Sequence, residues 1–128
     1  MRMDWLGMFV PRINFRRPSL ESLNEPQEDD LERLAELREQ GSRLELPHPV
    51  RGFLVFETEP AARQSAELLQ KEGFRCTIRA GQDWSWVTTA VIQIVPTPGA
   101  ITKMREQFAG VTSAHGGIYR GWDAPVVY

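Results

Sequence analysis

Four segments of the chain carry the residue patterns of β-strands. Residues 51–58 (RGFLVFET) and 84–95 are rich in β-branched and aromatic side chains, and residues 118–122 (IYRGW) follow a double glycine. Residues 74–79 (FRCTIR) alternate between apolar and polar positions. That alternation sends two sets of side chains to opposite faces of a strand, with Phe74, Cys76 and Ile78 inward and Arg75, Thr77 and Arg79 outward.

Three other segments place apolar residues three or four positions apart, as amphipathic helices do. The first helix is predicted over residues 26–41, with acidic residues in its first turn and a glycine at its end. The second is predicted over residues 59–72, with Thr58 as its N-cap. The third follows Thr97 and ends before Gly116.

After the leading helix, the predicted order is β-α-β-β-α-β, in two halves whose helices both start with a threonine followed closely by a proline. This order predicts an α+β fold, a ferredoxin-like βαββαβ sandwich with one antiparallel sheet and two helices on one face. The leading helix would be added at an edge or an end. Residues 1–25 show no clear period, and we interpret them as an N-terminal arm preceding a single domain, residues 26–128.

The composition fits one globular domain, with 128 residues of which 41% are hydrophobic and 25% charged. Cys76 is the only cysteine, so no internal disulfide forms and the cytoplasm is the expected location. Its place in an alternating strand indicates a buried small hydrophobe rather than a nucleophile. The apolar run at residues 5–10 is too short for a secretory signal, and no segment is expected to span a membrane.

Charge is unevenly distributed along the chain, although the net charge is only −2. Residues 1–18 hold four arginines against one aspartate, whereas residues 19–45 hold nine acidic residues against three arginines. We interpret the acidic tract mainly as a solvated helix face, with an acidic docking surface as the alternative. Basic residues are not enriched over the whole domain, so non-specific binding of nucleic acid is not expected.

The sequence contains no recognisable motif of a catalytic or metal-binding site. Neither His48 nor His115 has a cysteine, histidine or acid at ligand spacing, so we predict no metal site. There is no Walker-type phosphate loop and no GxSxG elbow. Asp83 and Asp123 each stand beside a tryptophan, but both also sit where turn residues belong. We therefore predict no catalytic residues and no enzyme.

The segment RGFLVFET begins like the octamer of the RNA-recognition motif, a module with the same βαββαβ order. The match then fails, because Leu54, Val55 and Thr58 occupy positions that need a small residue or an aromatic one. The octamer also belongs on the third strand of that module, not the first. RNA binding through Arg75, Arg79 and the arm is therefore kept only as an alternative.

The sheet face away from the helices is the best candidate for a binding surface. If Ala90, Ile92 and Ile94 face the helices, the same strand turns Val87, Thr89, Val91 and Gln93 outward, beside Arg75, Thr77 and Arg79. Residues 51–58 are apolar on both sides, so either of two pairs adds hydrophobic surface there: Leu54 and Phe56, or Phe53 and Val55. Mixed apolar and guanidinium surfaces are typical of protein interfaces.

Two alternatives to a partner interface stay open for this face. The N-terminal arm or a homodimer mate would also cover it. Trp84, next to the turn at residues 80–83, is either packed against the domain or an anchor for a partner.

The segments VPTPGAITKMREQF (residues 95–108) and HGGIYRGWDAPV (residues 115–126) together resemble the ribonuclease E inhibitor family, the B-type regulators of ribonuclease E activity. FLVFETEPAA and LLQKEGF, within residues 53–74, fit the same family. The resemblance covers about residues 27–126, and its most specific part is the segment that contains Tyr119, Gly121 and Trp122. In this motif Gly121 is expected to permit a close backbone approach and Trp122 to cap the core.

The resemblance implies a ferredoxin-like cytoplasmic protein that has no cofactor and acts by binding. Its better-known relatives associate with ribonuclease E and lower the RNA-cleaving activity of that enzyme, so the expected partner is ribonuclease E or a related RNA-degrading complex. The family offers no catalytic residues to carry over to this chain.

Overall fold

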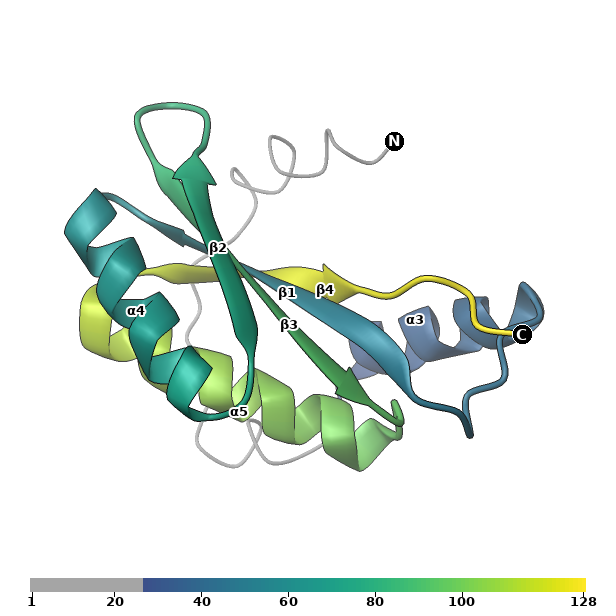
Figure 1. The fold of residues 1–128 in the computed structure, drawn as a ribbon. Helices are drawn as coiled ribbons and strands as arrows, with labels where there is room; N and C mark the ends of the chain where they lie inside the picture. Colours follow the sequence, from purple (N-terminus) through teal and green to yellow (C-terminus); the bar gives the residue numbers. More distant parts are fainter. Residues whose placement is uncertain (1–26) are drawn as a thin grey trace.

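The computed structural model describes residues 27–128, and the arm predicted over residues 1–25 lies outside them. The leading helix, predicted over residues 26–41, is shorter than expected at both ends. The described elements follow the predicted order (Figure 1): α3 (Glu28–Glu39), β1 (His48–Phe56), α4 (Glu59–Lys71), β2 (Arg75–Ala80), β3 (Trp86–Ile94), α5 (Pro98–His115) and β4 (Ile118–Asp123).

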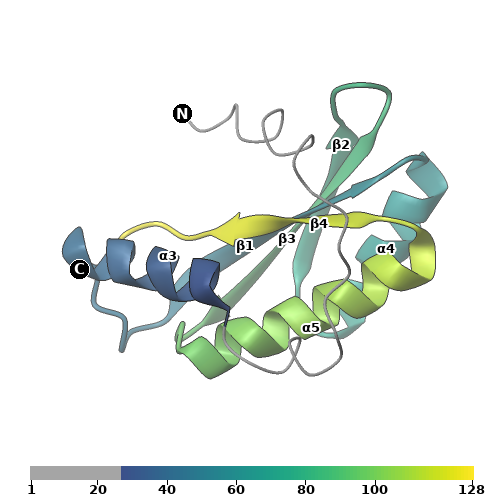
Figure 2. The same ribbon diagram turned by 180° about the vertical axis from the view of Figure 1, so that it is seen from behind.

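The strands form one antiparallel sheet in the order β2-β3-β1-β4. Helices α4 and α5 cover one face of this sheet, and no helix from residues 27–128 covers the other (Figure 1). Seen from behind, α3 lies beside the start of α5, near the β4 edge (Figure 2). The predicted α+β ferredoxin-like fold is therefore confirmed, with the leading helix placed at this edge.

The two helices on the sheet begin at the threonine caps that the sequence predicts. Thr58 Oγ1 accepts a hydrogen bond from the amide of Ala61 at 3.2 Å, and Thr97 Oγ1 accepts one from the amide of Ala100 at 3.0 Å. Each hydroxyl satisfies an amide hydrogen that has no partner within its helix. The proline in each first turn is tolerated because its missing hydrogen would have been unpaired there anyway.

Strand β1 (His48–Phe56) shows that the predicted bounds, residues 51–58, are wrong at both ends. Pro49 pairs with Gln93 of β3, whereas the pairing of β1 with β4 starts only at Arg51. A proline cannot donate a ladder hydrogen bond, and it is accommodated here because this end of β1 has a strand neighbour on one side only. Pro49 therefore lies inside the strand and does not mark its start.

The core lies between the sheet and helices α4 and α5, and the fully buried ring of Phe108 is central to it. The centroid of this ring lies 5.2 Å from that of Phe74 and 5.4 Å from that of Tyr119. A Cβ atom on Gly52 would lie only 2.1 Å from the Phe108 ring. Glycine at position 52, in the segment that resembles an RNA-binding octamer, is thus required by packing.

Strand β4 contains a bulge of one extra residue. Gly52 pairs with Trp122 and Leu54 with Tyr119, so the register shifts between these two pairs. Gly121 in the bulge has a φ of +111°, a backbone conformation that favours glycine. Because successive side chains of a regular strand alternate, residues three apart would face opposite sides, and the bulge brings both aromatic rings to the helix side.

A Cβ atom on Gly121 would meet no heavy atom within 4 Å. The expected reason for this glycine, a close backbone approach, is therefore wrong, and its positive φ is the reason instead. The expectation for Trp122 is confirmed, because its side chain is only 3% exposed and belongs to the core cluster.

Candidate functional site

The sheet face without helices brings together the residues that the alternation predicted to point outward. The register of β2 and β3 pairs them directly across the strands, as Arg75 with Val91, Thr77 with Thr89, and Arg79 with Val87. Cys76 and Ile78 are partly buried and pack against the core on the other side, as predicted. Gln93 lies near the end of β3, opposite Pro49.

The structure also decides which residues of β1 face outward. Leu54 and Phe56 are 0% and 1% exposed and belong to the core under the helices. Phe53 and Val55 therefore face the open side, where Phe53 pairs with Thr89 in the next strand. The outward face thus combines apolar side chains in its middle with arginines at its β2 edge.

Exposure varies among the candidate residues of this face. Arg75, Thr77, Arg79 and Gln93 lie on the outward side and are all exposed. Thr89 and Val91 are half-buried. The side chain of Val87 is only 4% exposed and offers little surface to a partner.

The arginines of this face differ in their pairing. Arg51 on β1 forms a bidentate ion pair with Asp123 of β4, with both nitrogen–oxygen distances at 2.8 Å. This hydrogen bonding raises the pKa of Arg51 above its ordinary value. By contrast, Arg75 and Arg79 form no ion pair with any residue in 27–128. Their charges are available to a partner.

The tip of the β2–β3 hairpin presents Trp84 to solvent, with 94% of the residue exposed. Asp83 and Trp84 have φ values of +58° and +62°, which are uncommon for residues other than glycine. The amide of Gly81 donates to the carbonyl oxygen of Ser85 at 2.8 Å, and Ser85 Oγ donates to the carbonyl oxygen of Gln82 at 2.6 Å. The turn therefore holds the indole away from the domain rather than packing it.

A buried ion pair connects α3 to the rest of the domain, and no local pattern in the chain indicates it. Asp30 accepts a hydrogen bond from Arg105 Nη1 at 2.7 Å and another from Trp122 Nε1 at 2.9 Å. The Asp30 and Arg105 residues are only 7% and 8% exposed. The sequence pattern assigns Asp30 only to the helix dipole, because its partners lie 75 and 92 positions further along the chain.

Tyr119 belongs to the family motif together with Gly121 and Trp122, and its ring packs beside Phe108 in the core. Its hydroxyl oxygen is buried and has no hydrogen-bond partner among residues 27–128. Burial, together with the negative charge of Asp30, raises the pKa of Tyr119 well above its ordinary value. The motif therefore acts in this structure through packing, a backbone bulge and one buried hydrogen bond.

His48 and Ser42 form a second buried contact that the sequence did not reveal. His48 Nδ1 lies 2.7 Å from the carbonyl oxygen of Leu46, and its Nε2 lies 2.6 Å from Ser42 Oγ. Ser42 Oγ also accepts a hydrogen bond from the amide of Val127 at 2.9 Å. These bonds tie the C-terminal residues to the segment between α3 and β1, which gives the pair a structural role.

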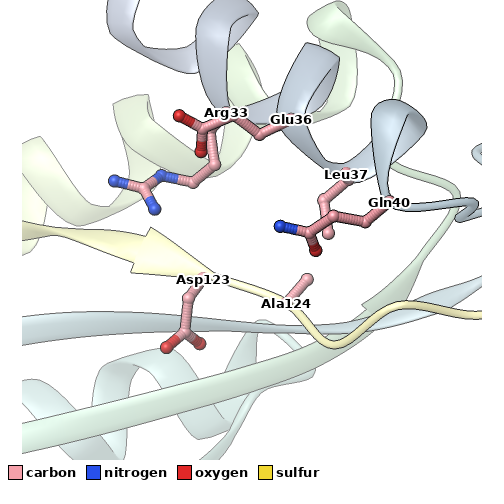
Figure 3. A pocket seen from close by; sticks show the side chains of 6 residues that line it. All are labelled: Arg33, Glu36, Leu37, Gln40, Asp123 and Ala124. Atoms are coloured by element: carbon pink, nitrogen blue, oxygen red, sulfur yellow. The ribbon is translucent and has the colours of Figure 1, made fainter. Parts of the chain in front are cut away.

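A shallow pocket of about 180 Å³ opens between α3 and the chain that follows β4 (Figure 3). Its lining is formed by Arg33, Glu36, Leu37, Gln40, Asp123 and Ala124. Two of its charged groups already have partners, since Arg33 lies 5.7 Å from the centroid of the Trp122 ring and Asp123 binds Arg51. The pocket has no convergent set of acids and histidines among these residues.

Within residues 27–128, no three His, Cys, Asp or Glu side chains are grouped so as to hold a metal ion. In the same part of the chain, no helix combines the length and the apolar character that crossing a membrane requires.

The fold and the contacts of α3 define residues 27–128 as a ferredoxin-like α+β domain with an integral leading helix and a sheet face that none of their helices covers. Its sequence matches the family described as regulator of ribonuclease activity B over residues 27–124. The chain belongs to this family, and the resemblance seen in the sequence is confirmed. The match spans every described element from α3 to β4. No curated protein matches the sequence.

Proposed function

We propose that this chain binds a ribonuclease of the ribonuclease E type in the cytoplasm and lowers its RNA-cleaving activity, without catalysing a reaction itself. The observation that carries the proposal is its membership, over residues 27–124, of a family of regulators of ribonuclease activity. A protein that regulates another enzyme in this way acts through its surface, so the contact residues should lie on an exposed face.

The helix-free sheet face supports this proposal by its composition. It places the exposed guanidinium groups of Arg75 and Arg79 on the same face as outward apolar side chains, with the half-buried Val91 directly opposite Arg75. Arginine and aromatic residues are enriched in protein interfaces, where apolar centres are surrounded by polar rims. The proposed contact residues are Arg75, Thr77, Arg79, Thr89, Val91, Gln93 and Trp84.

The direct test uses the purified chain and ribonuclease E purified from the same organism. We expect a complex of defined stoichiometry in isothermal titration calorimetry without RNA. We also expect the initial rate of cleavage of a fluorescent RNA to fall as the complex forms. Failure to form a complex, or unchanged cleavage at full occupancy, would contradict the proposal.

A matched pair of variants tests the face. Thr89→Lys places a long charged side chain in the middle of the proposed surface, whereas Gln64→Lys adds the same charge on α4, on the opposite layer. We expect Thr89→Lys to weaken binding about tenfold or more, because interface centres tolerate unpaired charge poorly. Gln64→Lys should bind like the unmodified chain. Equal binding by both variants would show that the contact surface is not the helix-free sheet face.

Direct RNA binding is the competing explanation, since guanidinium groups also bind phosphates. Filter binding of RNA to the chain alone, at two salt concentrations, separates the two. We expect no binding at micromolar concentration. Micromolar binding that weakens steeply with salt would replace the proposed function by RNA binding.

A further inference from the structure

Strand β2 (Arg75–Ala80) forms one edge of the sheet, with β3 as its only strand neighbour among residues 27–128. The other side of an edge strand presents unpaired N–H and C=O groups, which are a ready template for another chain. Proteins often block such an edge with proline, a bulge or charged side chains. Strand β2 contains no proline and its pairing with β3 is regular from Arg75 to Ala80, so its two arginines are the only one of these devices it carries. The backbone of β2 is therefore suited to receive one more strand.

The charges along this edge restrict what such a strand can be. Arg75 and Arg79 are four residues apart, so both point to the helix-free face, with their Cα atoms roughly 13 Å apart. Both are exposed, and neither forms an ion pair within residues 27–128. Some other exposed arginines are paired within the domain, as Arg51 is with Asp123 and Arg63 with Glu59.

We propose that the β2 edge accepts an extended segment of the partner protein as a fifth strand, and that this segment carries acidic residues opposite Arg75 and Arg79. This inference rests on the proposed function, because the partner is the ribonuclease. Residues directly opposite in antiparallel strands have Cβ atoms about 5 Å apart, so acids at these positions form cross-strand ion pairs on the open face. Main-chain hydrogen bonds supply the remaining contacts.

A second copy of this chain would meet like charges at this edge in one antiparallel register. Antiparallel pairing of two β2 strands centred on Thr77 would place Arg75 of one copy opposite Arg79 of the other, twice. Like charges directly opposite in a sheet are destabilising. In that register, the charge pattern therefore favours an acidic strand from a different protein over a homodimer.

Trp84 extends the proposed contact beyond the end of β2. Figure 1 shows that the β2–β3 hairpin projects past the rest of the sheet. The indole at its tip is 94% exposed and is held by a hydrogen-bonded turn. Tryptophan is enriched among the residues that contribute most to binding in protein interfaces. Trp84 is expected to pack on apolar residues that precede or follow the acidic segment.

The first experiment measures amide hydrogen exchange of the full chain, alone and with purified ribonuclease E. Strand addition predicts slower exchange of β2 amides in the complex, because amide hydrogens at the open edge acquire hydrogen-bond partners. Docking of side chains alone would leave the exchange of β2 unchanged and would overturn the inference. This readout uses the unmodified chain, so it does not depend on the folding of a variant.

The second experiment compares charge reversals by calorimetry with the same enzyme. We expect Arg75→Glu/Arg79→Glu to weaken binding about tenfold or more, since two attractive pairs become repulsive. The matched control, Arg63→Glu/Lys71→Glu on α4, changes the net charge equally on the opposite layer and should bind within about twofold. Arg75→Lys/Arg79→Lys keeps the charges and should stay close to the unmodified chain.

The outcomes separate this inference from the proposed function. If the unmodified chain binds and inhibits the ribonuclease while Arg75→Glu/Arg79→Glu binds equally well, the acidic-strand inference is wrong and the proposed function stands. If the unmodified chain does not bind the ribonuclease, both are wrong. A control double variant that weakens binding as much as Arg75→Glu/Arg79→Glu would also contradict the inference, because the effect would then be one of net charge.

Discussion

The carboxylate of Asp30 and the indole of Trp122 are joined by a buried hydrogen bond of 2.9 Å, although the two residues lie 92 positions apart in the sequence. The same carboxylate binds Arg105 of α5. Helix α3 is thereby fixed to both α5 and β4, and the most specific part of the family motif is fixed to the first described helix. The leading helix is a structural part of the domain and not an appendage.

Replacing Asp30 by alanine should strongly destabilise the domain. Asp30→Ala leaves the buried Arg105 guanidinium without its carboxylate, and breaking a buried ion pair from one side costs about 3–5 kcal/mol. Urea unfolding followed by circular dichroism measures this loss. Asp29→Ala, at an exposed position in the same helical turn, is the control and should cost at most about 1 kcal/mol. Equal effects of the two variants would show that the buried pair contributes little.

Replacing Gly121 by alanine should destabilise the domain by about 1–3 kcal/mol, because an L-residue is strained at its φ of +111°. A side chain at this position would meet no atom within 4 Å, so the cost would come from the backbone rather than from a clash. The free energy of unfolding is the measurement. A change below about 0.5 kcal/mol would mean that β4 adopts another bulge at no cost, and it would contradict the role assigned to this glycine.

Gly52 and Gly110 should respond to alanine in opposite directions. At Gly52 the new methyl group would lie 2.1 Å from the Phe108 ring, so we expect a loss of about 1–3 kcal/mol from overpacking. Gly110 lies inside α5, where a Cβ atom would meet no heavy atom within 4 Å, and alanine there should stabilise the domain by about 0.5–1 kcal/mol. Thermal unfolding of both variants checks the pair, and a shift of the same sign in both would contradict it.

The thiol of Cys76 should react slowly in the folded protein. Burial raises the pKa of Cys76 from an ordinary value of 9.0 to about 11, so very little thiolate exists at pH 8. We expect alkylation by iodoacetamide at this pH to be much slower in buffer than in urea. Rapid alkylation of the native chain would contradict the packing described for β2.

The same shift has a consequence for the stability of the fold at alkaline pH. Because the folded pKa is the higher one, the contribution of Cys76 is complete below pH 9 and is lost as the pH rises towards 11. Cys76→Val removes this thiol, and its free energy of unfolding should decline less over that interval than that of the unmodified chain. Parallel declines would show that other groups account for the whole effect.

The elements that were predicted correctly are those specified by local chemistry. The alternation of residues 74–79 identified β2 and its outward arginines, and the threonine caps located the starts of α4 and α5. Each of these signals depends on neighbours within a few residues. The two sides of β1 were not distinguished, because Phe53 and Leu54 are equally apolar and only the packing against the helices separates them.

The features that were missed depend on residues brought together by the fold. Asp30 looked like one acid among several in a helical first turn, and nothing near it indicated a buried guanidinium partner. Likewise, Ser42 and His48 show their role only through their contact with Val127 at the other end of the chain. The bulge at Gly121 was missed because a register shift is set by the neighbouring strand.

Trp84 and Trp122 stand at opposite extremes of contact with water, at 94% and 3% exposure. Indole emission shifts to shorter wavelengths when water is removed, and a collisional quencher such as acrylamide reaches only an accessible ring. Docking at the hairpin and loosening of the α3–β4 contact would therefore produce opposite spectral shifts. In a variant with Trp5 and Trp86 replaced by phenylalanine, these two indoles would be separate optical reporters of the surface and of the interior.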